Sequence, residues 1–466
     1  MDSSLLSKIQ PDKGFKYIFY ILFSYFLFIF ITALFGNGHT AATSLLIILF
    51  AFFISSTSLI YLLRRTLFIK VDYIIVLLIF FLQSSIGIIH FITVINPEYF
   101  LENIAGVDIE NGYYYWDIFY FSYLIDLIAE SRLEEGYLSV NLLEGGIHKN
   151  YFLAYMLSDL FYFGDAYPLN LIAINMLSIF YSGILLSLIC HYIFKITNLI
   201  KLRTVFYLTI MQPMAWIPSH SMRDIFGAFI IVLGVSMIFF AHGRSQKIFS
   251  YLFSMILVFQ HRSIYAVSII FAIFAQNSLR LKDIINNIWL VLALLILSIF
   301  VLLGSDYALS FINIFVSSQE NSMLSGSIND RNAGIIEHFI KLIIGPFPWT
   351  QFYDGSVVGY SSYYASTQIL NSSWTLTIIF LLFKNIKNIY KSYENRQLFF
   401  TILLFGVPAV FSLGGMNLYL LPSTFLSIPL LVILVPVKRI VLTFSTITLL
   451  YILTSGIFYF AKYHFF

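Results

Sequence analysis

Long apolar runs, separated by short polar segments, dominate this sequence. Runs such as Tyr17–Leu34 and Thr43–Leu63 approach the roughly 20 residues that a helix needs to cross the hydrocarbon layer of a bilayer. They do not alternate polar and apolar residues over segments of about ten, as the strands of an outer-membrane barrel do. The pattern therefore predicts an all-α protein, a polytopic transmembrane helical bundle.

Basic residues between the apolar runs predict the orientation of the bundle, because positive charges stay on the cytoplasmic side of short loops. The clusters that mark the inside are Lys8/Lys13/Lys16, Arg64/Arg65/Lys70, Lys195/Lys201/Arg203, Arg244/Lys247, Arg280/Lys282, Lys384/Lys387/Lys391 and Lys438/Arg439. An even number of crossings must separate neighbouring clusters. The predicted spans lie near 14–35, 42–63, 72–94, 168–194, 204–219, 224–241, 248–260, 263–276, 285–304, 366–383, 397–414, 418–437 and 440–460, about thirteen in all.

This arrangement treats residues 1–466 as a single integral membrane domain with a cytoplasmic N-terminus and two long external segments. The first, 95–167, is rich in carboxylates, and its short apolar stretch Lys149–Gly164 predicts an interfacial or re-entrant helix. The second external loop covers 305–365. The first apolar run lacks a small-residue cleavage site after its core, so we expect it to be a retained signal anchor.

Composition agrees with a membrane protein and narrows its chemistry. Hydrophobic residues make up 59% of the 466 residues and charged residues only 11%, against about 25% charged in a soluble domain. The single cysteine, Cys190, excludes a disulfide framework. Without a glycine-rich phosphate loop or metal-ligand spacing, we expect neither ATP hydrolysis by this chain nor a metal or other cofactor.

Two arginines, Arg223 and Arg262, are predicted to lie toward the external side of the membrane, although positive charges of short loops usually stay inside. Arg262 divides a hairpin with only about thirteen apolar residues on each side, too few for two full crossings. Arg223 stands at the tip of the preceding hairpin. An ionisable group at membrane depth costs about 2.5–3.5 kcal/mol on insertion scales, which makes it a candidate functional residue.

These arginines, with Arg331 in the second external loop, predict a site for an anionic ligand. One guanidinium group can donate two parallel hydrogen bonds to two oxygens of a phosphate. His220, Asp224 and His261 lie beside them and are candidate supporting residues. The structural alternative is that Arg223 pairs with Asp224, or with a carboxylate of the acidic loop, and only holds the fold together.

Candidates for acid–base work lie in the external loops. Glu337 and His338 follow Arg331 by two helical turns, and a histidine with a pKa near 6.5 suits proton transfer from a hydroxyl. Asp117 ends the aromatic run Tyr113–Asp117, an arrangement typical of sugar sites. The alternatives are a solvated loop histidine and an interfacial aromatic belt.

The layout resembles that of the Wzy-type O-antigen and capsule repeat-unit polymerases, within the GT-C-like class of membrane glycosyltransferases. The features that carry the resemblance are Asp117 in an acidic external segment, Lys149–Gly164 leading into a span, Pro218–Asp224 opening a span, His261-Arg262 in a short hairpin, Gly345–Trp349 in the late loop and Pro422 in a late span. Arg223 and Gly234 have a spacing reported in some polymerases, but here it falls within a span and we interpret it as coincidence.

The resemblance implies a glycosyltransferase of the inner membrane, acting on its periplasmic face. Its partners would be an undecaprenyl-diphosphate-linked glycan donor and acceptor, with a chain-length regulator and a flippase, and no nucleic acid. Three alternatives stay open: an O-antigen ligase, a glycosyltransferase that uses a polyprenyl-phosphate sugar, and a flippase of lipid-linked oligosaccharides.

Overall fold

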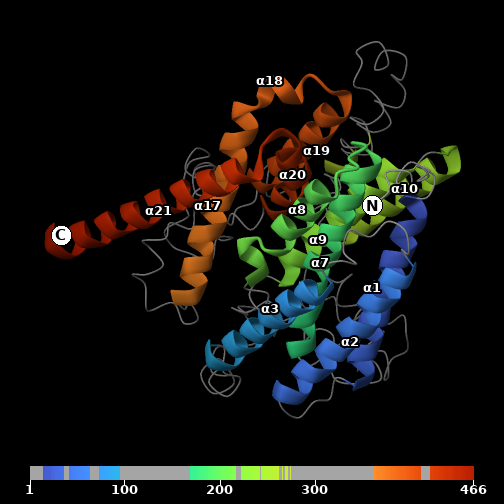
Figure 1. The fold of residues 1–466 in the computed structure, drawn as a ribbon, viewed down its shortest axis with the longest axis horizontal. Coiled ribbons are helices and arrows are strands. Elements are labelled where there is room, and N and C mark those ends of the chain that lie inside the picture. Colours follow the sequence, from blue (N-terminus) through green and yellow to red (C-terminus); the bar gives the residue numbers. More distant parts are fainter. Residues whose placement is uncertain are drawn as a thin grey trace, which may run out of the picture. The chain divides into compact units, whose positions relative to one another are not determined.

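The computed structural model describes residues 14–35, 41–62, 73–94, 168–216, 222–241, 243–261, 265, 268–270, 273, 362–410 and 420–465. Within these ranges the chain forms helices joined by short turns, and no strand occurs (Figure 1). The all-α prediction is confirmed for this part of the chain. The external loop 95–167 lies outside it, as does 305–365 except for its last four residues.

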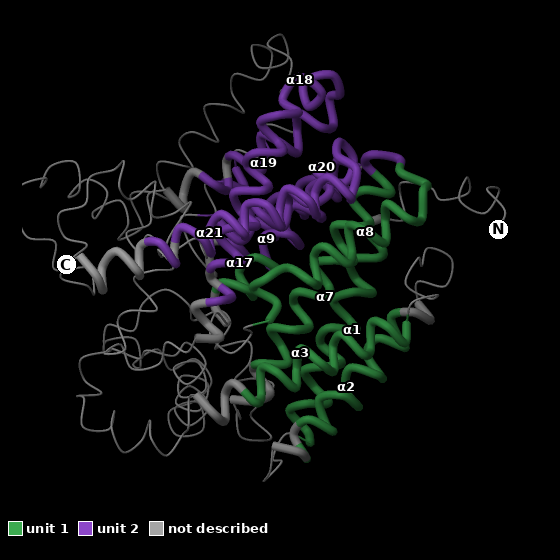
Figure 2. Tube along the Cα trace, turned by 60° about the vertical axis from the view of Figure 1, so that its left-hand side comes forward, with its two compact units in different colours: residues 1–192, 196–229 green, residues 193–195, 230–466 purple. Residues whose placement is uncertain are grey.

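The helices group into two compact units (Figure 2), which we describe separately. Unit 1 comprises residues 1–192 and 196–229, and unit 2 comprises residues 193–195 and 230–466. The division falls within one helix, α9, between Phe229 and Ile230.

Unit 1 is built around one buried helix. Its elements are α1 (Gly14–Phe35), α2 (Ala41–Leu62), α3 (Tyr73–Val94), α7 (Pro168–Tyr192), α8 (Leu199–Ile210), the 3₁₀ helix η6 (Pro213–Trp216) and the first turns of α9 (Met222–Phe240). Helix α7 packs against α1, α2, α3 and α8. Its residues 172–190 are all buried, including the lone Cys190.

Hydroxyl groups lie inside unit 1, whereas a stripe of phenylalanine side chains on α1 faces outward. The Ser24 hydroxyl donates to the Ser55 carbonyl oxygen at 2.6 Å and contacts the Tyr181 hydroxyl, and the Tyr25 and Ser178 hydroxyls are 3.0 Å apart. The exposed stripe on α1 comprises Phe19, Phe23, Phe26 and Phe30. This distribution suits a lipid environment, in which small polar residues join helices and apolar residues face the acyl chains.

Unit 2 contains the rest of α9 and the helices that follow it. These are α10 (Arg244–His261), α17 (Ser362–Lys384), α18 (Ile386–Ile389), α19 (Tyr393–Val410), α20 (Leu421–Leu434) and α21 (Val437–Phe465). Helix α17 packs on α20 and α21, and α19 packs on α20. The short α18 joins α17 to α19.

Among the described residues, three helical segments are long and apolar enough to cross a membrane: Phe15–Phe35, Ile172–Tyr192 and Val437–Thr454. Shorter apolar helices accompany them, at Leu45–Leu59, Tyr73–Ile89, Asp224–Phe240, Ile369–Lys384 and Leu421–Leu434. The described residues therefore support a membrane-associated helical protein. A bundle of about thirteen spans is not confirmed.

The bounds predicted for the first four spans are confirmed within two residues by α1, α2, α3 and α7. The bounds predicted near 204–219 are wrong, because α8 covers 199–210. The Asn198 side chain caps the helix by accepting from the Ile200 N–H at 2.9 Å, so Lys201 falls in the first helical turn and not in a loop. Pro213 disfavours a helical conformation for the residue before it, and α8 ends before that point.

Candidate functional site

The strongest structural irregularity in unit 1 is the interruption between α8 and α9. Helix α8 has 12 residues, which is about 18 Å at 1.5 Å per residue. The hydrocarbon layer is about 30 Å thick, so a helix of this length does not cross it. Beyond Ile210 the chain turns at Met211 and Gln212 and continues as η6.

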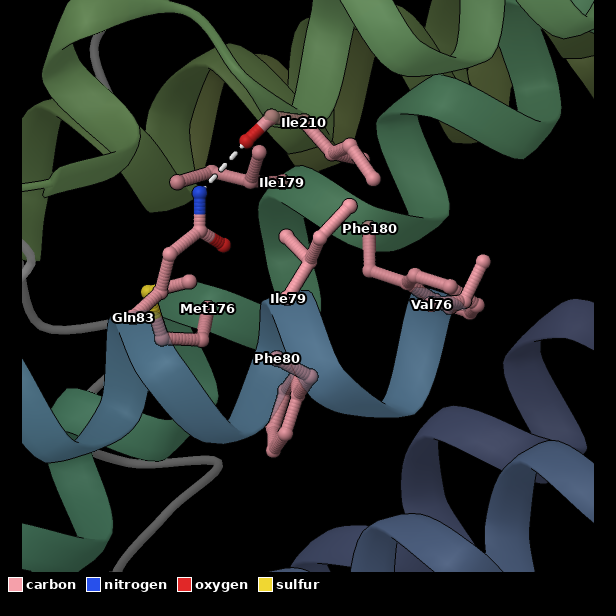
Figure 3. A pocket seen from close by; sticks show the side chains of 8 residues that line it. All are labelled: Val76, Ile79, Phe80, Gln83, Met176, Ile179, Phe180 and Ile210. Atoms are coloured by element: carbon pink, nitrogen blue, oxygen red, sulfur yellow. Dashed lines mark hydrogen bonds between the residues drawn. The ribbon is translucent and has the colours of Figure 1, made fainter. Parts of the chain in front are cut away.

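Most of the interruption, from Gln212 to Ala215, is buried in protein. Pro213, Met214 and Ala215 of η6 are buried, and η6 packs against α3. The carbonyl oxygen of Ile210, at the end of α8, accepts a hydrogen bond of 2.7 Å from the Gln83 amide Nε2 of α3 (Figure 3). Non-helical backbone at membrane depth is tolerated only where protein or a water-filled cavity satisfies its polar groups. Gln83 does this for Ile210.

A small cavity adjoins this hydrogen bond (Figure 3). Its lining consists of Val76, Ile79, Phe80, Gln83, Met176, Ile179, Phe180 and Ile210, from α3, α7 and α8. Its volume is about 10 Å³, close to the ~10–15 Å³ that one water molecule needs. This cavity has about the volume of one water molecule and is far too small for a sugar.

Two further polar side chains near the interruption are buried without a hydrogen-bond partner in the described structure. Gln212 is 3% exposed, and neither atom of its amide group is bonded. The Ser84 hydroxyl of α3 is also unbonded, whereas Ser178, Ser182 and Ser187 of α7 donate to carbonyl oxygens of their own helix. Buried polar groups of this kind normally bind water or a ligand.

The next described helix is α9, which begins at Met222. Arg223 and Asp224 occupy its first turn, and the Asp224 side chain is half-buried. A carboxylate in the first turn interacts favourably with the positive end of the helix dipole. Arg223 is separated from Phe240, at the other end of the helix, by 17 residues of helix, or about 25 Å.

Of the nine predicted site residues, the described structure contains three. Arg223 and Asp224 lie in α9, and His261 is the last residue of α10. The others, Asp117, His220, Arg262, Arg331, Glu337 and His338, lie outside the described residues. A shared cavity for the three arginines thus stays a prediction.

Gly234 has a packing role that accounts for its small size. The Ser254 hydroxyl of α10 donates to the Gly234 carbonyl oxygen at 3.1 Å. A Cβ at position 234 would lie 3.3 Å from the Ser254 Cβ and 3.5 Å from the Ile269 Cδ1. Close approach of α9 and α10 therefore explains Gly234, which follows Arg223 after ten intervening residues, without any catalytic motif.

The sequence reasoning missed Gln83 and Gln212. Each is an amide side chain next to or within a strongly apolar run, and polar groups in such runs are candidate functional residues in the same way as charged ones. A search for uncharged polar residues in the apolar runs would have found both.

Within the described ranges, no three histidine, cysteine, aspartate or glutamate side chains gather as a metal site. The described part of the site thus comprises the end of α8, η6 and the start of α9, with Gln83 bonded to the end of α8, Gln212 in the turn that follows, and Arg223 and Asp224 in the first turn of α9. The chain matches no protein-family model, no curated protein and no solved structure.

Proposed function

We propose that this chain is a bacterial inner-membrane glycosyltransferase that polymerises undecaprenyl-diphosphate-linked oligosaccharide repeat units on the periplasmic face, as an O-antigen or capsule polymerase. The observation that carries the proposal is the break after the short helix α8, which continues as η6, together with the position of Arg223 in the first turn of α9.

The start of α9 suits a phosphate group. The first N–H groups of a helix have no partner within it, and the helix dipole makes this end positive. Arg223 adds a full positive charge at the same end of a 19-residue helix. A lipid diphosphate presents its charge at the membrane surface, where the end of α9 opposite the cytoplasmic Arg244 would meet it.

The proposed reaction transfers the growing glycan to the incoming repeat unit. A hydroxyl oxygen of the acceptor sugar bonds to the anomeric carbon of the donor, and the bond from that carbon to the diphosphate oxygen breaks. Undecaprenyl diphosphate leaves with the bonding electrons, and Arg223, Arg262 and Arg331 stabilise the charge that develops on it. His338, or a carboxylate of Asp117 or Glu337, takes the hydroxyl proton.

Supporting roles fall to Asp224, His220 and His261, which orient the arginines. The lipid anchors of donor and acceptor account for a site among membrane helices, and the energy stored in the diphosphate linkage removes the need for a nucleotide donor. In this proposal the N-terminus is cytoplasmic, and a chain-length regulator and a flippase act with the enzyme.

Deleting the gene and separating lipopolysaccharide on a gel tests the proposal. We expect core carrying a single repeat unit in place of a ladder. Bare core with lipid-linked polymer would indicate a ligase instead, and bare core without polymer a flippase.

Complementation of the deletion with point variants tests the arginine site. Arg223→Ala and Arg262→Ala should abolish the ladder while protein levels in the membrane stay normal. Arg244→Ala, an exposed arginine at the start of α10, serves as the matched control and should restore the ladder. Normal ladders from the first two variants would contradict a diphosphate site built on these residues.

A further inference from the structure

One end of unit 2 gathers exposed cations from three helices. Helices α17 and α21 run antiparallel, because Trp374 meets Phe444 at 5.6 Å between ring centroids while Ser372 hydrogen-bonds Tyr451. From Trp374 to Ser372 the residue number falls along α17, while from Phe444 to Tyr451 it rises along α21. The last residue of α17, Lys384, therefore lies at the same end as the first turn of α21.

Helices α19 and α20 extend this arrangement. The Ser423 hydroxyl of α20 donates to the Ile402 carbonyl oxygen of α19 at 3.1 Å, and α18 leads directly from the end of α17 to the start of α19. The end of α20 leads through Pro436 into α21. All these turns lie at one end of unit 2 (Figure 2).

We call this set of residues the basic end. Its members are Lys384, Lys387, Lys391, Lys438 and Arg439, all exposed. The Lys384 ammonium lies 5.8 Å from the Phe380 ring centroid, and the Lys391 ammonium donates to the Asn388 side chain at 3.0 Å. The Phe380 ring and the Asn388 amide are uncharged, so both lysines keep their positive charge.

The basic end has little negative charge to balance it. Across the described residues 362–410 and 420–465, the only carboxylate is Glu394. That group already accepts a 2.6 Å hydrogen bond from the Ser392 hydroxyl and is attracted to Lys195. The five cations of the basic end thus keep a net positive field.

Apolar side chains at the same end are exposed beside these cations. Phe383 is 70% exposed, Tyr390 48% and Val437 40%. Aromatic rings with lysines and arginines nearby are typical of the level of lipid headgroups, where ring and alkyl stem contact acyl chains and the charge reaches the phosphates. A soluble anion would require the cations but not the exposed rings.

We propose that the basic end is a binding site for anionic phospholipids, whose headgroup phosphates pair with its five cations. This claim is independent of the glycan reaction. Basic residues next to membrane helices attract anionic headgroups by about 1 kcal/mol each, which corresponds to about a fivefold change in binding.

The test is lipid retention by the purified full-length protein. The protein is exchanged into micelles with equal amounts of phosphatidylglycerol and phosphatidylcholine, and retained lipid is quantified by mass spectrometry. We expect phosphatidylglycerol to be enriched. The variant Lys387→Ala/Lys391→Ala/Arg439→Ala should lose at least tenfold of that preference, while Lys387→Arg/Lys391→Arg/Arg439→Lys should keep it.

Lys16→Ala removes an exposed cation of α1, outside the basic end, and should leave the preference unchanged. Since all three altered residues of the basic end are exposed, elution as a single species verifies that the variants fold. Equal retention of both lipids by the unaltered protein, or an unchanged preference in the alanine variant, would overturn the proposal. So would displacement of the lipid by inorganic phosphate at matched ionic strength, which would identify a site for free phosphate.

Discussion

Helices α7 and α21 are both long and apolar enough to cross a membrane, but they differ in their surroundings. Residues 172–190 of α7 are all buried, whereas only 11% of Val437–Thr454 in α21 is buried. Helix α7 buries Asn175, Ser178, Ser182 and Ser187 against its neighbours. Helix α21 contacts α17 along one side and exposes leucine and isoleucine elsewhere.

The difference teaches that hydropathy identifies a span without indicating whether protein or lipid surrounds it. Lipid chains are as apolar as leucine, so burying leucine against another helix yields little in a bilayer. Small residues let helices approach closely, and hydroxyl groups can bond across the contact. Both helices carry such residues, but the serines of α7 are buried, whereas Ser445 and Thr446 of α21 are exposed, which agrees with the central place of α7 in unit 1.

The largest effect is expected from enlarging a glycine on each helix. A Cβ at Gly183 of α7 would lie 3.0 Å from the Phe206 ring and 3.3 Å from Ile210, whereas no atom lies within 4 Å of a Cβ at Gly456 of α21. Gly183→Leu should therefore lower stability by about 1–3 kcal/mol. Gly456→Leu should cause no loss.

Thermal unfolding in detergent, followed by the loss of soluble monomer, measures both variants. Comparable losses from the two glycines would contradict the distinction between a central helix and a lipid-facing one.

A smaller effect is expected from deleting a single hydroxyl group on each helix. Tyr181→Phe removes the contact with Ser24, and Tyr451→Phe removes the bond with Ser372. Hydrogen bonds between membrane helices contribute about 0.6 kcal/mol on average. Both variants should lose that amount in the same unfolding assay, because each hydroxyl lies at a helix contact. A loss confined to Tyr181→Phe would indicate that α21 does not depend on its contact with α17.

The smallest effect is expected from the Glu394 carboxylate at the start of α19. One of the groups that attract it is Lys195, in the turn that follows α7, which adopts a left-handed conformation with φ 54°. The Ser392 hydrogen bond, the backbone N–H of Glu394 and the charge of Lys195 lower the pKa of Glu394 below its usual 4.5. Its folded pKa is thus lower than its unfolded pKa. The stabilising contribution is present above pH 4.5 and is lost as the pH falls through the folded value.

Unfolding temperatures of the unaltered protein and Glu394→Gln, compared across this pH range, test the prediction. The difference between them should shrink on acidification below pH 4.5 and stay constant above it. A difference that grows on acidification would mean that the carboxylate is not stabilised in its charged form.

The sequence was sufficient to locate most described helices, because long apolar runs leave few alternatives in a membrane. It failed at α8, where basic residues were assigned to a loop although Lys201 belongs to a capped helix. Long basic side chains extend from a helical turn to the aqueous phase, so their position does not fix where a helix begins.

The candidate site could be predicted only in part. Arg223 stands out in the sequence because charge is rare in apolar runs. The bond between Gln83 and Ile210 joins residues 127 positions apart, and no periodicity or motif relates them. Contacts of this kind follow from the packing of α3 on the end of α8, which is a property of the folded unit.

The burial of Cys190 has a practical consequence. It is the only cysteine in the chain, and it is fully enclosed in α7. A thiol-reactive spin label or fluorophore added to the folded protein should leave it unmodified. The natural sequence is therefore already a nearly unreactive background for labelling. One cysteine introduced on the outward face of α1 or in the first turn of α9 would report its own exposure to water, and two introduced cysteines would report the distance between their labels.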